Sequence, residues 1–300
     1  MKYGETKIYH VPVLLSEIMS FLAVKRGNWY IDATVGDGGY TQKILQSGGR
    51  VLAIDQDEGS LKRTKERLRE FVSTGQLKIK LGNFRHLQNF LKEANLGEIS
   101  GIVFDLGMST YQLKESQRGF SFKTWEKLDM RMSVENTLTA ANIVNTYDKE
   151  DLYEIFRTFG EEHLAGAIAD ALIRARTLNP ISDAMSLHQL VSDVYLKFGI
   201  KEKKDPATRV FQALRIAVNH ELDVLEEVLP QSVNCLAKGG ILAIVSFQSL
   251  EDRLAKLFMK QEKISGRGFL VTAKPIIPGE KEIQSNPAAR SAKLRVMQKL

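Results

Sequence analysis

One stretch of the chain, residues 30–55, constrains the fold more than any other. It begins with the apolar pair Tyr30-Ile31, passes through a turn that ends at Gly38-Gly39, and closes on an apolar run that stops at Asp55. Glycines let a backbone approach a ligand closely, and a carboxylate about 20 residues further on, at a strand end, can accept hydrogen bonds from ribose hydroxyls. The stretch predicts an α/β domain that binds a nucleoside cofactor. The alternative is a tight strand-to-helix turn with no ligand.

The charges in this turn indicate which nucleoside it suits. A dinucleotide site places a pyrophosphate at the helix N-terminus, where acidic side chains compete with it. Here Asp32 and Asp37 lie in the loop, and Thr41 replaces the third glycine of G-x-G-x-x-G. The turn therefore favours an adenosine that carries a cationic tail, which describes S-adenosylmethionine.

Composition is that of an ordinary globular protein, with 43% hydrophobic and 26% charged residues. No run approaches the roughly 18 apolar residues of a membrane span, and the N-terminus lacks a basic region followed by an apolar one. We expect a cytoplasmic protein with no membrane partner. The single cysteine, Cys235, excludes an internal disulfide and a cysteine cluster for zinc, and no metal is expected.

The basic charge is concentrated at one end of the chain. The net charge is +6, and residues 251–300 hold 11 Lys or Arg against 5 Asp or Glu, which accounts for the whole excess. Such a surface is typical of a protein that binds a polyanion such as nucleic acid. The same excess of basic residues would also arise if these lysines and arginines only face solvent and bind no partner.

Two further strands are expected to end beside the glycine turn. Residues 77–81 form a strand followed by Phe84, which either stacks on an adenine or belongs to the core. Residues 99–104 form a buried strand that stops at Asp105. Ligands bind at the carboxyl ends of strands in open α/β sheets, so Asp32, Asp55 and Asp105 are predicted to share one rim.

The alternation of strands and helices then stops, and several helical segments follow one another. A long helix opens at Asp205-Pro206 and carries an apolar stripe through Leu225, and the parallel sheet resumes at Ile241. Residues 268–273 and 293–297 fit a closing hairpin in which Lys293 and Arg295 face solvent. We expect a discontinuous domain of residues 1–112 and 206–300, with residues 113–205 inserted as a mostly helical domain.

With these elements placed, nearly the whole chain resembles the MraW-type S-adenosylmethionine-dependent methyltransferases, which act on N4 of a cytidine in 16S ribosomal RNA near the decoding centre. The motifs that carry the resemblance are HVPVLLSE, YIDATVGDGGYT, LAIDQD, FDLGMSTYQL, RGFSF, LDMRM, PATRVFQALRIAVNHEL, SFQSLEDR and NPAARSAKLR. The resemblance implies a Rossmann-like class I methyltransferase fold, a doubly wound and mostly parallel sheet, with an inserted helical domain for substrate recognition.

The resemblance also implies the site. The cofactor-binding positions are Gly38, Gly39, Tyr40, Asp55, Phe84, Asp105 and Gln112. Tyr40 stands where the family usually has histidine, so only a backbone contact is expected there. Gln248 likewise replaces a histidine. The predicted RNA contacts are Arg118, Arg131, Arg209, Arg215, Asn286 and Arg290, each of which would otherwise be an ordinary surface residue.

The expected chemistry is direct displacement by an exocyclic amine, with the rate gained from positioning and exclusion of water. Asp105 is the predicted catalytic residue, as acceptor for an N–H of the amine, and Cys235 is read as a structural thiol rather than a nucleophile. The substrate is then 16S ribosomal RNA or the small ribosomal subunit. Alternatives are a methyltransferase for another RNA, DNA or protein, or an RNA-binding module without catalysis. The sequence leaves a homodimer open.

Overall fold

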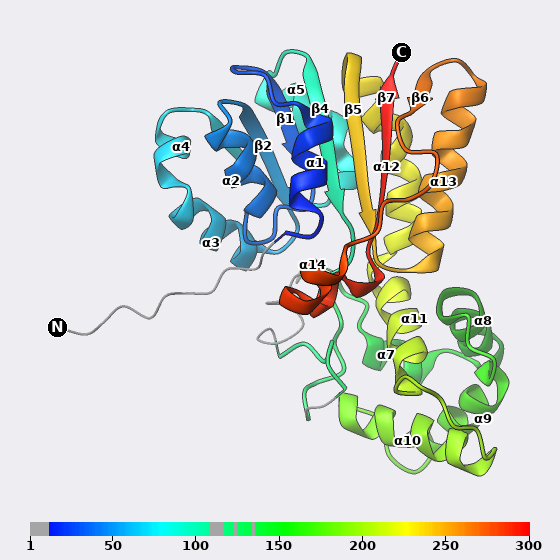
Figure 1. The fold of residues 1–300 in the computed structure, drawn as a ribbon. Coiled ribbons are helices and arrows are strands. Elements are labelled where there is room, and N and C mark those ends of the chain that lie inside the picture. The colour runs from blue at the N-terminus through cyan, green and yellow to red at the C-terminus, as the bar shows by residue number, and fades with distance from the viewer. Residues whose placement is uncertain (1–11, 109–116, 123–124, 134–135) are drawn as a thin grey trace. The chain divides into compact units, whose positions relative to one another are not determined.

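A computed structural model describes residues 12–108, 117–122, 125–133 and 136–300 of the chain. It contains two compact units, one formed by Met1–Gly107 with Leu222–Leu300 and the other by Met108–Glu221 (Figure 1). We call them the sheet unit and the helical unit. No helix in the described parts is long and apolar enough to cross a membrane.

The sheet unit is built on seven strands in the order β3-β2-β1-β4-β5-β7-β6. Their bounds are β1 Trp29–Asp32, β2 Arg50–Asp55, β3 Leu77–Leu81, β4 Ile99–Asp105, β5 Leu236–Ser246, β6 Gly268–Leu270 and β7 Lys293–Lys299. The first five strands are parallel, whereas β7 runs antiparallel to both β5 and β6. This is the class I methyltransferase fold, so the predicted fold class is confirmed.

Helices cover both faces of this sheet, which explains why the central strands read as continuous apolar runs. On one face pack α1 Leu15–Leu22, α2 Gly39–Gln46 and α3 Glu58–Arg67, with α4 Arg69–Ser73 following directly. On the other face pack α5 Leu87–Ala94, α12 Glu221–Cys235 and α13 Ser249–Ile264. The short helices η1 Phe84–His86, α14 Glu280–Ser285 and η2 Pro287–Ser291 complete the unit.

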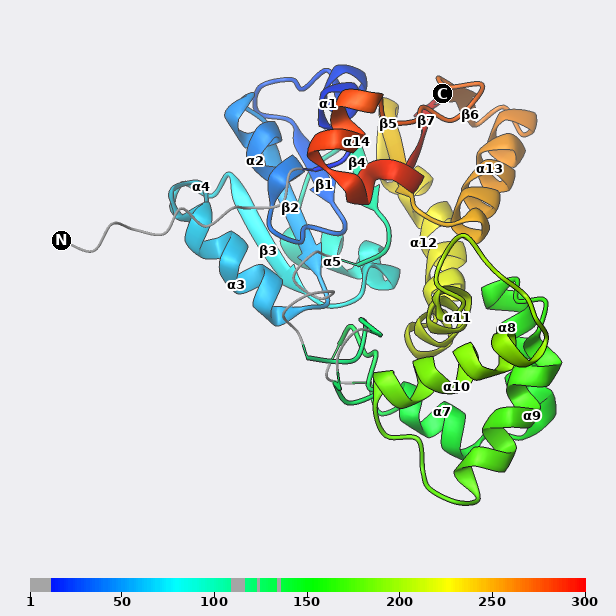
Figure 2. The same ribbon diagram turned by 60° about the horizontal axis from the view of Figure 1, so that its bottom comes forward.

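The segments near the two ends of the sheet unit meet at one place. The helix α14 lies beside α1 (Figure 2), and the backbone N–H of Leu14, which precedes α1, donates to Glu282 Oε1 at 2.7 Å. Leu14 has a left-handed backbone with φ 53°. Glu282, close to the C-terminal end of the chain, is therefore tied to the segment that precedes α1.

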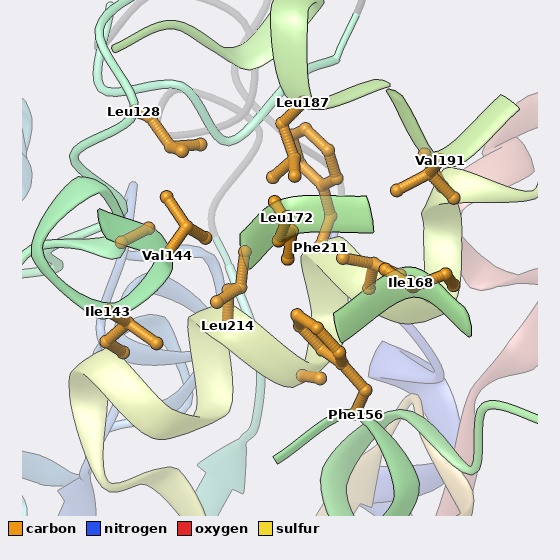
Figure 3. Packing of buried hydrophobic residues seen from close by; sticks show 14 of the residues in the cluster. Leu128, Ile143, Val144, Phe156, Ile168, Leu172, Leu187, Val191, Phe211 and Leu214 are labelled. Carbon is orange, nitrogen blue, oxygen red and sulfur yellow. The ribbon is translucent and has the colours of Figure 1, made fainter. Parts of the chain in front are cut away.

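The helical unit has its own hydrophobic core. Its helices are α7 Ala140–Thr146, α8 Lys149–Gly160, α9 Ala165–Arg176, α10 Ala184–Lys197 and α11 Ala207–Asn219. Phe156, Leu172, Leu187 and Leu214 point toward one another in its centre, each fully buried (Figure 3). The region predicted to be helical is confirmed as such, although the helices begin and end at slightly different residues.

The predicted long helix from residue 206 through Leu225 is wrong. His220 adopts a left-handed conformation with φ 51° and divides the segment into α11 and α12. The helix α11 packs against α8, and the missing Cβ of Gly160 would lie 2.8 Å from the carbonyl oxygen of Arg209. The structure thus groups α11 with the helical unit, whereas we expected residues 206–300 to belong together.

Candidate active site

The turn between β1 and α2 is shaped by left-handed glycines. Gly36 and Gly38 have φ 50° and 78°, a region that costs other residues energy. The turn is also tied to β2, because the N–H of Val35 donates to the carbonyl of Ile54 at 3.0 Å. The loop is therefore held in place by the sheet beneath it.

Protein packing explains why Gly38 and Gly39 carry no side chains. A Cβ on Gly38 would lie 3.0 Å from the methyl group of Thr64, and one on Gly39 would lie 2.1 Å from Pro12 Cγ. Packing within the protein therefore requires glycine at both positions, and a backbone contact of either with a cofactor stays a prediction.

Asp32 ends β1 and lies inside the turn. Its side chain is completely buried, and its Oδ2 accepts from the Thr41 hydroxyl at 2.6 Å and the Thr41 N–H at 3.1 Å. Burial raises its pKa to about 6. Thr41, which departs from the dinucleotide-binding pattern, thus serves to hold this carboxyl.

Asp37 does not face the cofactor as a bare charge, contrary to our reading of the turn. Its Oδ1 pairs with Arg63 Nε at 3.0 Å, and its backbone carbonyl accepts from Arg67 Nη1 at 2.7 Å. Both arginines come from α3, so the charge of Asp37 is already compensated within the protein. The acidic character of the site comes from the strand ends instead.

Asp55 ends β2 and connects two turns. Its Oδ2 accepts from the Gly36 N–H and its Oδ1 from the Asp57 N–H, both at 2.9 Å. Burial, opposed by these two hydrogen bonds, raises its pKa to about 6. The side chain keeps some contact with solvent, and a carboxylate oxygen has a second lone pair, so ribose hydroxyls can still be bound.

Asp105 ends β4 on the same rim. Its backbone N–H donates to Thr34 Oγ1 at 2.7 Å, which fixes the strand end beside the turn. Its Oδ1 is buried and has no hydrogen-bond partner among the described residues. Burial, followed by the charges of Asp32 and Glu251, raises its pKa to about 8, while an interaction with the Tyr40 hydroxyl lowers it.

The three carboxyls fit a cationic nucleoside. Asp32 and Asp105 each have one buried oxygen that lacks a partner in the described structure, and every one of the three pKa values is raised. Clusters of raised carboxyl pKa values are typical of functional sites. A cation bound beside these carboxyls would favour their ionised forms. The structure places all three on one rim, as predicted.

Tyr40 has a structural contact that the sequence did not reveal. Its ring is buried, and its hydroxyl donates to the carbonyl oxygen of Val13 at 2.5 Å. Burial, followed by the charges of Asp105, Asp32 and Glu282, raises its pKa well above the usual value, so the phenol keeps its proton. The side chain fastens the segment before α1 to the glycine turn.

Phe84 lies in η1, next to the carboxyl end of β3. It is half-buried, and its ring makes an edge-to-face contact with Phe104 at a centroid distance of 5.4 Å. The contact belongs to the core, and adenine stacking on the remaining surface stays a prediction. Gln112 lies outside the described residues.

Gln248, noted in the sequence only as the replacement of a histidine, contacts Glu251 after β5, and this contact was not predicted. Glu251 is buried, and its Oε2 accepts from the backbone N–H of Phe247 at 3.0 Å. Its Oε1 accepts from Gln248 Nε2 at 3.1 Å. The signal that could have found them is a carboxylate three residues after a polar residue at a helix start, which is the spacing of a capping interaction.

Two of the predicted RNA-binding arginines contact a loop of the helical unit. Arg118 Nη1 donates to the backbone carbonyls of Arg131 and Met132 at 3.2 and 3.0 Å. Arg131 makes a two-pronged ion pair with Asp129, at 2.7 and 2.8 Å. Both guanidinium groups therefore order this loop, and phosphate contacts by either stay a prediction.

Two others lie on α11 and are paired as well. Arg215 makes a two-pronged ion pair with Glu221 at 2.7 and 2.9 Å, largely out of solvent. Arg209 Nη1 contacts His163 Nδ1 at 2.8 Å and Glu202 at 3.2 Å, and it keeps 40% of its side-chain surface exposed. Of the two, Arg209 is the more open to a ligand.

The prediction that Lys293 and Arg295 face solvent is wrong for Arg295. That side chain is buried and pairs with Asp252 of α13, with Nε–Oδ1 at 2.7 Å, and Lys293 contacts the same carboxylate at 3.4 Å. The cause is that α13, which carries Asp252, packs on this face of β7, while Leu294 and Val296 are buried on the other face.

Asn286 and Arg290 lie in the loop before β7. The backbone of Asn286 is part of the turn that ends α14, where its N–H donates to the Glu282 carbonyl at 2.7 Å. Arg290 is exposed and makes no ion pair within the described structure. Its guanidinium is therefore available to a phosphate, and an RNA contact by Arg290 stays a prediction.

Comparison with known proteins extends over almost the whole chain. A "Ribosomal RNA small subunit methyltransferase H" from Sulfurihydrogenibium sp. is 43% identical over 294 residues, covering 96% of this chain and 98% of the relative. Proteins of the same name from Persephonella marina and Streptococcus mutans are 39% and 38% identical, covering 98% and 97% of this chain and 100% and 98% of the relatives. The model of the MraW methylase family matches residues 7–300. The chain therefore belongs to the MraW methylase family of S-adenosylmethionine-dependent methyltransferases.

Proposed function

We propose that this chain transfers a methyl group from S-adenosylmethionine to N4 of a cytidine in 16S ribosomal RNA, near the decoding centre of the small subunit. The observation that carries the proposal is the full-length similarity to relatives named for methylation of small-subunit ribosomal RNA. The rim carboxyls described above supply a site of suitable chemistry for the cofactor.

Each part of the cofactor has a suitable partner on the rim. Asp55 would accept hydrogen bonds from the ribose hydroxyls, and Asp32 and Asp105 would compensate the positive charge. The backbone of Gly38, Gly39 and Tyr40 and the ring of Phe84 would contact the remainder, with Gln112 as a further proposed contact. These assignments combine the geometry with the positions that the family resemblance implies.

When bound, S-adenosylmethionine supplies a methyl group on a cationic sulfur, and its transfer to an amine breaks the carbon–sulfur bond, leaves the electron pair on sulfur and releases one proton from nitrogen. Asp105 is the acceptor for an N–H of that amine and then for its proton. A nearby positive charge favours the ionised carboxylate that this role requires. Cys235 is unsuited to nucleophilic attack, because burial raises the pKa of its thiol and it lies beside the start of β5, at the opposite end from the rim.

The RNA contacts are assigned to both units. Arg118, Arg131, Arg209 and Arg215 belong to the helical unit, for which we propose substrate recognition over residues 113–205 and α11. Asn286 and Arg290 belong to the sheet unit. Arg290 is the strongest candidate, since its charge is not used by an ion pair in the described part of the chain.

The pH dependence of cofactor binding tests the assignment of the carboxyls. Binding of a cation favours their ionised forms, so affinity for S-adenosylmethionine should rise as pH increases from 6 to 8 and level off above the highest pKa. Each proton released contributes at most about a tenfold rise per pH unit. Calorimetry in two buffers of different ionisation enthalpy measures the released protons. In the Asp105→Asn variant, the rise in affinity for S-adenosylmethionine near pH 8 should disappear.

A substrate panel tests the function itself. The protein is incubated with methyl-labelled S-adenosylmethionine and with 16S RNA, 30S subunits, 23S RNA, DNA or ribosomal proteins. We expect label only in the small-subunit samples, and N4-methylcytidine in the digested RNA by mass spectrometry. Label in another substrate would reassign the enzyme, and cofactor binding without transfer to any of them would indicate a binding module.

A further inference from the structure

The side chain of Gln248 is oriented by its neighbour on α13. Its Nε2 donates to Glu251 Oε1 at 3.1 Å, and its backbone N–H approaches Glu251 Oε2 at 3.4 Å. A carboxylate only accepts hydrogen bonds, so the amide nitrogen, and not the amide oxygen, faces Glu251. The carbonyl oxygen of Gln248 is thereby turned away from Glu251.

That carbonyl oxygen is buried and unused. Gln248 Oε1 has no hydrogen-bond partner among the residues that the structure describes, and neither has Asp105 Oδ1. A buried acceptor without a partner costs free energy, which a ligand that donates a hydrogen bond would recover.

Both oxygens lie at the carboxyl ends of neighbouring strands. Asp105 pairs with Val245 in the ladder between β4 and β5, and the Leu106 N–H donates to the Val245 carbonyl at 2.9 Å. Beyond the ladder, the missing Cβ of Gly107 would lie 3.7 Å from Phe247 Cδ2. The two chain segments therefore stay together past the strand ends, up to Phe247, the residue before Gln248.

Glu251 provides a second link between the two sites. Its charge is among those that raise the pKa of Asp105, so it lies within electrostatic range of that carboxyl while it also holds Gln248. The group contains Asp105, Gln248 and Glu251, with Asp32 and Tyr40 as the other ionisable neighbours of Asp105.

From this geometry we infer that Gln248 Oε1 is a second acceptor for the target amine, so that one N–H is bound by Asp105 and the other by Gln248. The inference rests on the proposed function and names a further residue of the same site. Binding both hydrogens prevents rotation about the exocyclic C–N bond and keeps the nitrogen lone pair directed at the methyl donor. Asp105 takes the departing proton, whereas the amide of Gln248 accepts only a hydrogen bond.

The arrangement limits the enzyme to one transfer. After the first methylation the nitrogen carries one hydrogen and one methyl group. A second attack in the same pose would press that methyl against one of the two oxygens, where it forms no hydrogen bond and leaves the oxygen unpartnered. Monomethylated cytidine is then the end product.

The test compares Gln248→Met, which keeps length but removes the acceptor, with Gln248→Ala, which also opens space. We expect kcat to fall about ten- to a hundredfold in both variants, which is the effect of one lost hydrogen bond. KM should change less than kcat. The cofactor affinity, measured by calorimetry, should be unchanged. Gln248→Ala should also produce dimethylcytidine, detected by mass spectrometry. Gln261→Met, an exposed position on the same helix, is the matched control.

A binding measurement provides a readout apart from turnover. With S-adenosylhomocysteine present, the wild type should bind an RNA with the target cytidine more tightly than one with uridine, whose O4 would face two acceptors. Gln248→Met should reduce the ratio of the two affinities, cytidine RNA over uridine RNA, several-fold.

If Gln248 only supports the start of α13, both variants will melt at lower temperature but keep the wild-type kcat, the monomethyl product and the preference for cytidine, which would overturn the inference. Absence of methyl transfer by the wild type would count against the proposed function as well, so the two failures are distinguishable.

Discussion

Replacing Asp55 by alanine is expected to lower the affinity for S-adenosylmethionine by at least about a hundredfold, because the proposed ribose contacts and the shape of the site depend on one carboxylate. It accepts from the N–H groups of Gly36 and Asp57, and truncation leaves both without their acceptor. An unsatisfied buried group costs about 1–3 kcal/mol, so the free energy of unfolding should fall too.

Calorimetry measures the affinity and thermal melting measures the stability. Glu58→Ala, which removes an exposed acidic charge three residues away, is the control and should leave both unchanged. Asp55→Asn retains one acceptor oxygen and should lie between the alanine variant and the wild type. Unchanged cofactor affinity in Asp55→Ala would show that the ribose assignment is wrong.

Asp105→Asn is expected to lower turnover by about 10²- to 10⁴-fold, the range for loss of a general base. The amide keeps the shape of the side chain but cannot accept the departing proton. Cofactor affinity should change far less at pH 6.5, since the carboxyl, with a pKa raised to about 8, is mostly protonated there before binding. Melting temperature should stay the same or increase, because an uncharged group replaces a carboxyl that burial penalises.

The matched control for Asp105→Asn is Asp37→Asn, which makes the same change in a loop carboxylate that forms an ion pair with Arg63. Single-turnover kinetics with saturating cofactor separate the transfer step from binding. Equal losses in affinity and turnover would make Asp105 a binding residue only.

The rim could be predicted because it follows from a local pattern. Apolar runs that stop at Asp32, Asp55 and Asp105 become parallel strands, and the carboxyl ends of parallel strands lie on one edge of a sheet. Neither step depends on knowing which distant residues pack nearby. The confirmed fold class rests on the same alternation.

Errors arose where a distant partner decides the outcome. Asp37 is compensated by arginines of α3, and Arg295 is buried because α13, which carries Asp252, packs on that face of β7. The break at His220 was hidden because the apolar stripe continues through it, so helical periodicity alone does not reveal a change of direction. The unpartnered oxygen of Gln248 could not be predicted from the sequence, because it becomes visible only when all its neighbours are placed.

The position of β7 has a consequence for how the protein is made. It forms a ladder with β5 over Ile241–Ser246 and with β6 over Gly268–Leu270, yet it is synthesised after both. Until residues 293–299 emerge from the tunnel, β5 exposes an apolar edge and β6 has no neighbour, so the nascent chain offers an open sheet edge to other chains. The sheet is therefore completed only when β7, which follows its two partner strands in the chain, pairs with them, and a stalled or truncated chain that lacks β7 is a natural target for chaperones.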